Sequence, residues 1–191
     1  MASLPVTPLN EEEYLRIERA AFEKSEYHDG QMFAMSGGSP NHAFLSNTIG
    51  ALLRSQVPPG CRVFSSDLRV YIAAAKTYTY PDCSVVCGDL QLSSDEKDNV
   101  LNPVLIVEVL SPSTENYDRG KKFELDRTIE SLREYLIVHQ DRSYVEHFSK
   151  QDDGSWVLRE HEGSSGVIAI ARWNAPIALA DLYASALNPD S

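Results

Sequence analysis

The chain has 191 residues, of which 42% are hydrophobic and 24% charged, and a formal net charge of −11. This is the composition of an ordinary globular protein, and the length suits a single domain over residues 1–191 that buries its own core. The acidic balance argues against a protein that coats DNA through a basic surface, but it leaves room for an enzyme that contacts a few phosphates.

The N-terminal part of the chain predicts two helices separated by a hairpin. Asn10 is a suitable helix N-cap with Glu13 three residues later, the pattern of a capping box. The pair Asp29-Gly30 favours a tight hairpin turn, and Ser39 followed by Pro40 suits the start of a second helix, which then shows apolar residues at helical spacing. We therefore expect helices over 10–23 and 40–56 and strands near 25–28 and 31–35.

The remainder alternates short apolar runs with polar stretches. The run from Val104 to Leu110 is nearly all apolar, as in a strand buried on both faces. Beside this strand we expect strands over 61–73, 77–80, 82–87, 135–139, 144–149 and 156–160, a loop over 88–103, and helices over 115–131 and 177–187. This order predicts an α/β fold of the mixed α+β kind, with a central mixed sheet flanked by helices.

Targeting signals and cysteines bear on location. No apolar run reaches the length of a membrane span, and the first residues lack a basic stretch followed by an apolar one, so we expect a cytoplasmic protein. Three cysteines, an odd number, fit a reducing compartment. Cys83 and Cys87 lie four residues apart on an expected strand, where they would share one face and be buried as small hydrophobic residues.

Glu108 is the most informative residue because it lies in the middle of the apolar strand 104–110. A buried carboxylate is costly unless it is charge-paired or bound to a metal, so Glu108 indicates either a structural salt bridge or a metal site. Asp82 follows Pro81 at the start of another apolar strand. Two acids on neighbouring strands can place their oxygens around one Mg²⁺ ion.

Two segments resemble a known family. Pro81-Asp82 together with Glu108-Val109-Leu110 resembles the PD-(D/E)xK nuclease superfamily. The run Leu-Ile-Val-Glu-Val-Leu-Ser-Pro-Ser-Thr at 105–114, followed by Tyr-Asp-Arg-Gly-Lys-Lys-Phe at 117–123, is similar to the Uma-type restriction-endonuclease-like family. The resemblance runs from about Leu9 to Tyr183. It implies a restriction-endonuclease-like fold with its core over about 9–183.

Matched position by position, the resemblance implies that Asp82 and Glu108 are metal ligands for Mg²⁺, for which Mn²⁺ could substitute. Glu26 resembles an acid that family members bring near the metal, Lys122 matches the family's helical lysine, and Asp118 its preceding aspartate. Simpler alternatives stay open: a hairpin glutamate in water for Glu26, and an exposed helical lysine for Lys122.

The chain departs from the superfamily motif at Leu110, where the motif has a lysine, so the lysine is expected in the following helix. Lys121 could take the place of Lys122 if that helix is rotated, while Phe123 is expected to face the core. Asp126 stands where relatives often carry an aromatic residue, a departure that concerns helix packing and not the metal site.

Two further residues are weaker candidates. His42 falls in the first turn of the helix over 40–56, and helix N-termini favour anions. It could contact a phosphate or carry a proton, or it could be a capping or surface histidine. Asp67 is a further acid expected near the site.

These residues predict a metal-dependent endonuclease that hydrolyses phosphodiester bonds in DNA, which it would bind weakly because the chain is acidic. A homodimer is expected from the resemblance to restriction-like nucleases. The alternative is a catalytically inactive module of the same fold that binds nucleic acid or protein. The acidic charge favours that alternative, whereas the intact acid pair and lysine favour the enzyme. Hydrolysis of another phosphodiester is a third reading.

Overall fold

The computed structural model describes residues 8–35, 37–93, 98–111, 118–173 and 175–186. The helices are α1 (Glu11–Ala20), α2 (Pro40–Gln56), α4 (Phe123–Asp126) and α5 (Leu179–Leu182), with a 3₁₀ turn η1 (Ala73–Ala75) and a π-helical turn η2 (Asp118–Lys122). The first seven strands are β1 (Ser25–His28), β2 (Gln31–Ala34), β3 (Cys61–Ser65), β4 (Arg69–Ile72), β5 (Thr77–Thr79), β6 (Cys83–Cys87) and β7 (Asn99–Val100). The other six are β8 (Leu105–Val109), β9 (Glu134–Val138), β10 (Tyr144–Lys150), β11 (Trp156–Glu162), β12 (Val167–Ile170) and β13 (Ala175–Ala178).

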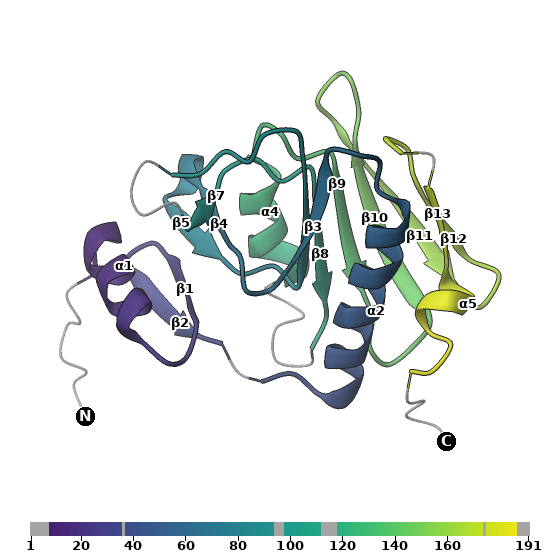
Figure 1. Ribbon diagram of the computed structural model, residues 1–191, viewed down its shortest axis with the longest axis horizontal. Coiled ribbons are helices and arrows are strands. Elements are labelled where there is room, and N and C mark those ends of the chain that lie inside the picture. Colours follow the sequence, from purple (N-terminus) through teal and green to yellow (C-terminus); the bar gives the residue numbers. More distant parts are fainter. Residues whose placement is uncertain (1–7, 36, 94–97, 112–117, 174, 187–191) are drawn as a thin grey trace.

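A six-stranded sheet in the order β11-β10-β9-β8-β6-β3 forms the centre of the molecule (Figure 1). β8 runs parallel to β9 and antiparallel to β6, so the central sheet is mixed, as the sequence predicts. Every residue of β8 and β9 is buried, in keeping with the mostly apolar sequence of both strands. These two strands form the interior framework on which the candidate site is built.

The two faces of the central sheet are covered by different elements. On one face, Leu45, Ile49 and Leu53 of α2 are buried in a cluster that also contains residues of β12, β13 and α5. On the other face, Phe123 and Leu132 belong to a cluster with residues of β4, β8 and β9. Figure 1 shows α2, β12, β13 and α5 on one side of the sheet and α4 with the smaller strands on the other. The mixed, helix-flanked architecture confirms the fold class expected from the sequence.

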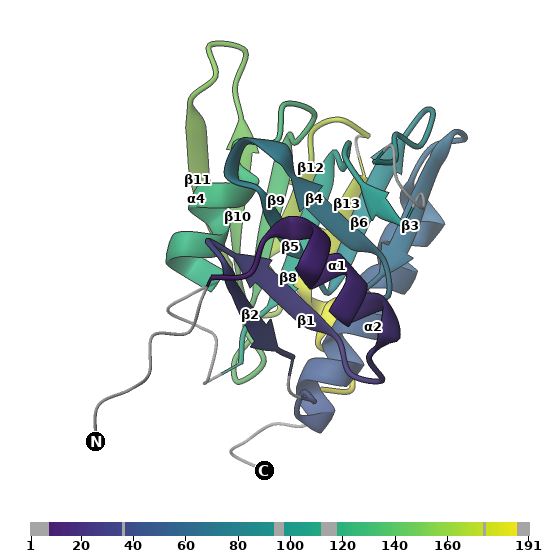
Figure 2. The same cartoon turned by 90° about the vertical axis from the view of Figure 1, so that its left-hand side faces the viewer.

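A second sheet of five strands, in the order β2-β1-β5-β4-β7, lies beside the central sheet and carries α1 on its outer side (Figure 2). α1 begins with the predicted capping box: the Asn10 side chain accepts from the Glu13 amide at 2.8 Å, and Glu13 accepts from the Asn10 amide at 3.0 Å. Tyr14 then stacks on Tyr27 of β1, with ring centroids 4.9 Å apart. This aromatic contact holds the N-terminal helix and hairpin together.

Several predicted boundaries are wrong. α1 ends at Ala20, because Ala21 is extended. The stretch 61–73 is broken by a turn into β3 and β4, and the expected loop over 88–103 contains β7, which pairs in parallel with β4. The expected helix over 177–187 is β13 followed by the short α5, and β12 pairs with β13. For β7 and β13, pairing with another strand overrides the local pattern.

The helix expected over 115–131 is much shorter in the structure. Residues 112–117 lie outside the described part of the chain, η2 occupies 118–122, and α4 ends at Asp126. Four-residue turns follow, with the amides of Thr128 and Ile129 donating to the carbonyls of Leu125 and Asp126. These tight turns keep Leu125 and Ile129 in the buried cluster against the central sheet.

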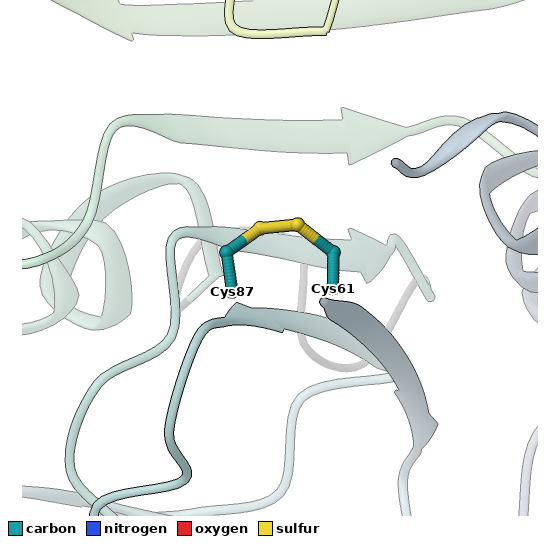
Figure 3. The surroundings of a disulfide bond; sticks show 2 residues. All are labelled: Cys61 and Cys87. Carbon is teal, nitrogen blue, oxygen red and sulfur yellow. A yellow bond between two sulfur atoms is a disulfide. The ribbon is translucent and has the colours of Figure 1, made fainter. Parts of the chain in front are cut away.

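The cysteines differ from expectation. Cys61 and Cys87 lie directly opposite each other on the antiparallel strands β3 and β6 and form a disulfide, with Cα atoms 4.0 Å apart (Figure 3). Cys83 is the buried free thiol among the described residues. The expectation of three reduced cysteines is therefore wrong, because strand pairing brings together two residues that are 26 positions apart.

None of the helices in the described part of the chain is long and apolar enough to cross a membrane.

Candidate active site

The site begins with Glu108 in the middle of β8. Its neighbours Val107 and Val109 belong to the core cluster under α2, whereas Ile106 and Leu110 belong to the opposite cluster. Because side chains alternate along a strand, Glu108 shares the face of Ile106 and Leu110. That face is turned toward η2, α4 and the smaller sheet, so Glu108 is directed into the space between the two sheets.

Lys122, the last residue of η2, reaches Glu108 in this space. Its Nζ lies 2.9 Å from Glu108 Oε1 and 3.1 Å from Glu26 Oε1. The side chains of Lys122 and Glu108 are each 5% exposed. Lysine is rarely buried so deeply without a charged partner, and the reading of Lys122 as an exposed helical lysine is wrong.

Lys121 faces the other way. Its side chain is 49% exposed, and its Nζ lies 3.4 Å from Glu124 Oε2. The next residue, Phe123, is buried in the core, as expected from the sequence. The helical register therefore directs Lys122, and not Lys121, toward the acids.

Glu26 comes to the same place from the smaller sheet. β1 is buried on both sides: Tyr27 packs under α1, and Glu26 is directed to the opposite side. The Glu26 Oε1 atom also accepts a hydrogen bond from the Tyr80 amide at 3.0 Å. This contact anchors the Glu26 carboxylate to the segment between β5 and Asp82. The reading of Glu26 as a hairpin residue in water is wrong.

Asp82 lies next to Glu108 across two neighbouring strands. Cys83 of β6 pairs with Val107 of β8, so the preceding residue, Asp82, is placed beside Glu108. The Asp82 Oδ2 atom accepts a hydrogen bond from the Val109 amide at 2.8 Å. This bond holds the Asp82 carboxylate at the end of β8, in the arrangement that the sequence predicts for the acid pair.

His42 contacts the same carboxylate from the first turn of α2. Its Nε2 lies 3.3 Å from Asp82 Oδ2, and its side chain is 20% exposed. The Ser39 hydroxyl caps the helix by accepting from the His42 amide at 3.1 Å. A Cβ at Gly38 would come within 2.6 Å of His42 Nδ1, so glycine is needed there for the imidazole to take this position.

The other candidates are not brought into the site. Asp67 is 84% exposed and pairs with Lys24, whose hydrogen bond and charge lower the pKa of the Asp67 carboxyl. Asp118 is part of η2, but its side chain lies outside the described residues. Asp126 is fully buried in α4, so the departure from an aromatic residue concerns helix packing, as expected.

Sequence reasoning missed a second polar cluster, at the ends of β8 and β9. The Leu110 amide donates to the Val138 carbonyl, which places the following residue, His139, near the end of β8. Arg119 of η2 lies with Nη2 2.7 Å from His139 Nε2 and also binds Glu146 of β10. Burial alone would raise the pKa of Glu146, but hydrogen bonds from His139 and Arg119 outweigh it and lower the pKa. The sequence signal for this cluster is the position of Arg119 three residues before Lys122, because residues three apart lie on the same side of a helix.

The acids fit a small divalent cation. Among the described residues, no group of three or more His, Cys, Asp or Glu side chains is arranged to hold a metal ion. Mg²⁺, however, is commonly held by one or two carboxylates, with water and substrate phosphate as its other ligands. Asp82 and Glu108 supply two such oxygen donors. The adjacent Cys83 is a poor ligand, because burial raises the pKa of its thiol to about 12.

Comparisons with known proteins bear on the fold and on the family. A solved structure described as "a putative nuclease belonging to DUF820", from Anabaena variabilis ATCC 29413, has the same fold, with a TM-score of 0.75 and 18% identity. The match covers 94% of this chain and 100% of that one. The resemblance therefore confirms the nuclease-like fold expected from the sequence.

Two proteins are similar to this chain in sequence over most of its length. The "Uncharacterized protein slr1290" of Synechocystis sp. (strain ATCC 27184 / PCC 6803 / Kazusa) is 40% identical over 85% of each chain. The "Uncharacterized protein sll1609" of the same organism is 38% identical over 82% of this chain and 89% of its own length. The model of the Uma2 family, described as "Putative restriction endonuclease", matches residues 11–173. Since that match spans most of the sequence, the chain belongs to the Uma2 family.

Proposed function

We propose that this protein is a metal-dependent endonuclease that hydrolyses phosphodiester bonds in DNA. The observation that carries the proposal is one group of charges in the interior: Lys122 contacts Glu26 and Glu108. Asp82 lies beside Glu108 on the neighbouring strand, where its carboxylate accepts from the Val109 amide. Burying uncompensated negative charge is costly. A divalent cation at Asp82 and Glu108 would offset the excess negative charge. Such an arrangement is more typical of a functional site than of an ion pair that only stabilises the fold.

Asp82 and Glu108 would hold Mg²⁺, with Mn²⁺ as a substitute. When bound, the ion supplies positive charge to the scissile phosphate and makes water a better nucleophile. Lys122 would donate a hydrogen bond to the attacking water or to the charge that develops on the phosphate. Glu26 holds the Lys122 ammonium group in position. His42, in contact with Asp82, would either contact the phosphate or give a proton to the leaving oxygen.

Nicking of supercoiled plasmid DNA tests the proposal. The wild type is incubated with Mg²⁺ or Mn²⁺, with EDTA as a blank, beside the variants Asp82→Asn, Glu108→Gln and Lys122→Met. Lys121→Met is the matched control, because it removes a neighbouring lysine that points away from the acids. We expect metal-dependent nicking by the wild type and the control, and loss of at least about a hundredfold in the three site variants.

The competing function is a catalytically inactive module that binds nucleic acid or protein. The net charge of −11 favours it, because a nuclease that grips duplex DNA normally carries a basic surface. A wild type that neither nicks DNA nor binds Mn²⁺ at millimolar concentration would support the module and overturn the nuclease. The site residues would then have a structural role only.

Two further expectations belong to this proposal. A homodimer follows from the resemblance to restriction-like nucleases, and light scattering coupled to size-exclusion chromatography tests it. A cytoplasmic location is the second expectation. Because disulfides are rare in reducing compartments, labelling of Cys61 and Cys87 in freshly lysed cells would show which environment the protein experiences.

A further inference from the structure

A cavity of about 920 Å³ opens beside Asp82 and His42. Its walls are α2, the loop between α1 and β1, the loop before α2, and the end of β3. Along α2, the lining residues His42, Ser46, Gly50 and Arg54 follow each other at every fourth position, so they share one face of the helix. From His42 to Arg54 the helix rises about 18 Å. The cavity is therefore an elongated groove that runs away from the candidate active site.

Two aromatic rings line this groove. Phe22, in the loop between α1 and β1, has a relative exposure of 109%, the highest of the large hydrophobic residues in the described chain. Phe64 of β3 lines the same groove and is half-buried. A phenylalanine that the fold leaves fully in water gives up the stabilisation that burial would provide, which points to a ligand that covers it.

The charged side chains of the groove can contact only a few phosphates of a bound nucleic acid. Lys24 and Arg54 line it, together with the acids Glu23 and Asp82. Lys24 is held by the Ser66 carbonyl at 3.0 Å and by Asp67. Two basic groups on a chain of net charge −11 are too few to grip a duplex by its phosphates alone. Base stacking on aromatic rings can provide affinity that does not depend on many cations.

We infer that this groove binds single-stranded DNA and leads it to Asp82. Bases would stack on Phe22 and Phe64, and phosphates would pass Lys24 and Arg54. At about 3.4 Å per nucleotide in a stacked strand, the helix length from His42 to Arg54 corresponds to about five nucleotides. The inference rests on the proposed nuclease function and specifies its substrate as an unpaired strand. Bases paired within a duplex do not present their faces for such stacking.

Fluorescence anisotropy with a labelled oligothymidine of about twelve nucleotides tests this inference, with a duplex of the same length as the comparison. EDTA is present throughout, so that neither metal binding nor cleavage contributes. The variants are Phe22→Ala and Arg54→Ala. The matched controls are Phe33→Ala, an exposed phenylalanine on β2 that does not line the groove, and Arg172→Ala, an exposed arginine elsewhere. All four side chains are exposed, so the substitutions should leave the fold intact, which circular dichroism checks.

We expect the wild type to bind the single strand more tightly than the duplex. Phe22→Ala and Arg54→Ala should each weaken single-strand binding by about fivefold or more, and the two controls should bind as the wild type does. Equal or tighter binding of the duplex would overturn the inference. Groove variants that bind no more weakly than their controls, or a wild type that binds no oligonucleotide at all, would overturn it as well.

This test is independent of the proposed reaction. A protein that binds the oligothymidine through Phe22 and Arg54 but never cleaves DNA in Mg²⁺ would support the groove and overturn the nuclease. A protein that cleaves DNA equally well with both groove residues replaced would support the nuclease and overturn the groove.

Discussion

The ammonium group of Lys122 lies 2.9 Å from Glu108 Oε1, at a depth where both side chains are 5% exposed. The two residues come from different elements, since Glu108 belongs to β8 and Lys122 ends η2. Each of the two buried charges offsets the desolvation cost of the other. The contact therefore ties the helical segment after β8 to the central sheet, and it makes stability sensitive to any change that removes one partner.

We expect Lys122→Met to lower the free energy of unfolding by about 3–5 kcal/mol, because it leaves buried carboxylates without their cation. Urea denaturation measures the change. Lys121→Met, whose side chain is half in water, should change stability by less than about 1 kcal/mol. If the two lysine variants are equally stable, the buried ion pair does not hold the fold together.

Metal binding should depend on the two acids that meet across β6 and β8. By isothermal titration with Mn²⁺, we expect Asp82→Asn and Glu108→Gln each to weaken binding by at least about tenfold, because each removes one of the two ligands that we propose. Asp67→Asn is the control, since Asp67 is 84% exposed and pairs with Lys24 away from the site. Weaker binding in the control, or equal binding in all proteins, would show that the ion sits elsewhere.

The Cys61–Cys87 disulfide should stabilise the fold, because it closes a loop between residues that are 26 positions apart. Chain-entropy arguments give about 3–4 kcal/mol for a loop of this length. We expect dithiothreitol to lower the wild-type Tm and to leave the double variant Cys61→Ala, Cys87→Ala unchanged. A wild-type Tm that is insensitive to the reductant would mean that the bond contributes nothing to stability.

His161 should lower the stability of the fold in mild acid. Its pKa is lowered from the usual value of 6.5 by burial, and further by the charges of His147 and Arg159. The unfolded chain therefore binds the His161 proton more readily than the folded one, so this contribution to stability is lost as the pH falls below about 6.5. We expect an NMR titration to give a midpoint for His161 below 6.5.

A matched variant separates His161 from other titrating groups. The Tm of the wild type should fall more steeply than that of His161→Gln between neutral and mildly acidic pH, because glutamine does not gain a proton. Parallel pH profiles would contradict the expectation.

Much of the framework could be predicted from local sequence alone. The apolar run around Glu108 marked a strand buried on both faces, and a carboxylate in such a strand is costly enough to indicate a partner. The capping pattern at Asn10 and the Ser39-Pro40 start of α2 were also predicted correctly, because caps depend on atoms only a few residues apart. These features are local, so their sequence patterns were sufficient.

Other features depended on contacts between distant parts of the chain. Only the tertiary structure showed that Glu26 is buried against Lys122, since a hairpin strand of this composition fits a solvent-facing position equally well. The pairing of Cys61 with Cys87 required the register of β3 on β6, and the end of α4 at Asp126 followed from packing against the central sheet. Local sequence is enough to identify the residues that carry the charges. The packing of two sheets around a helical turn decided which of those charges meet, because burial and pairing are properties of the assembled core.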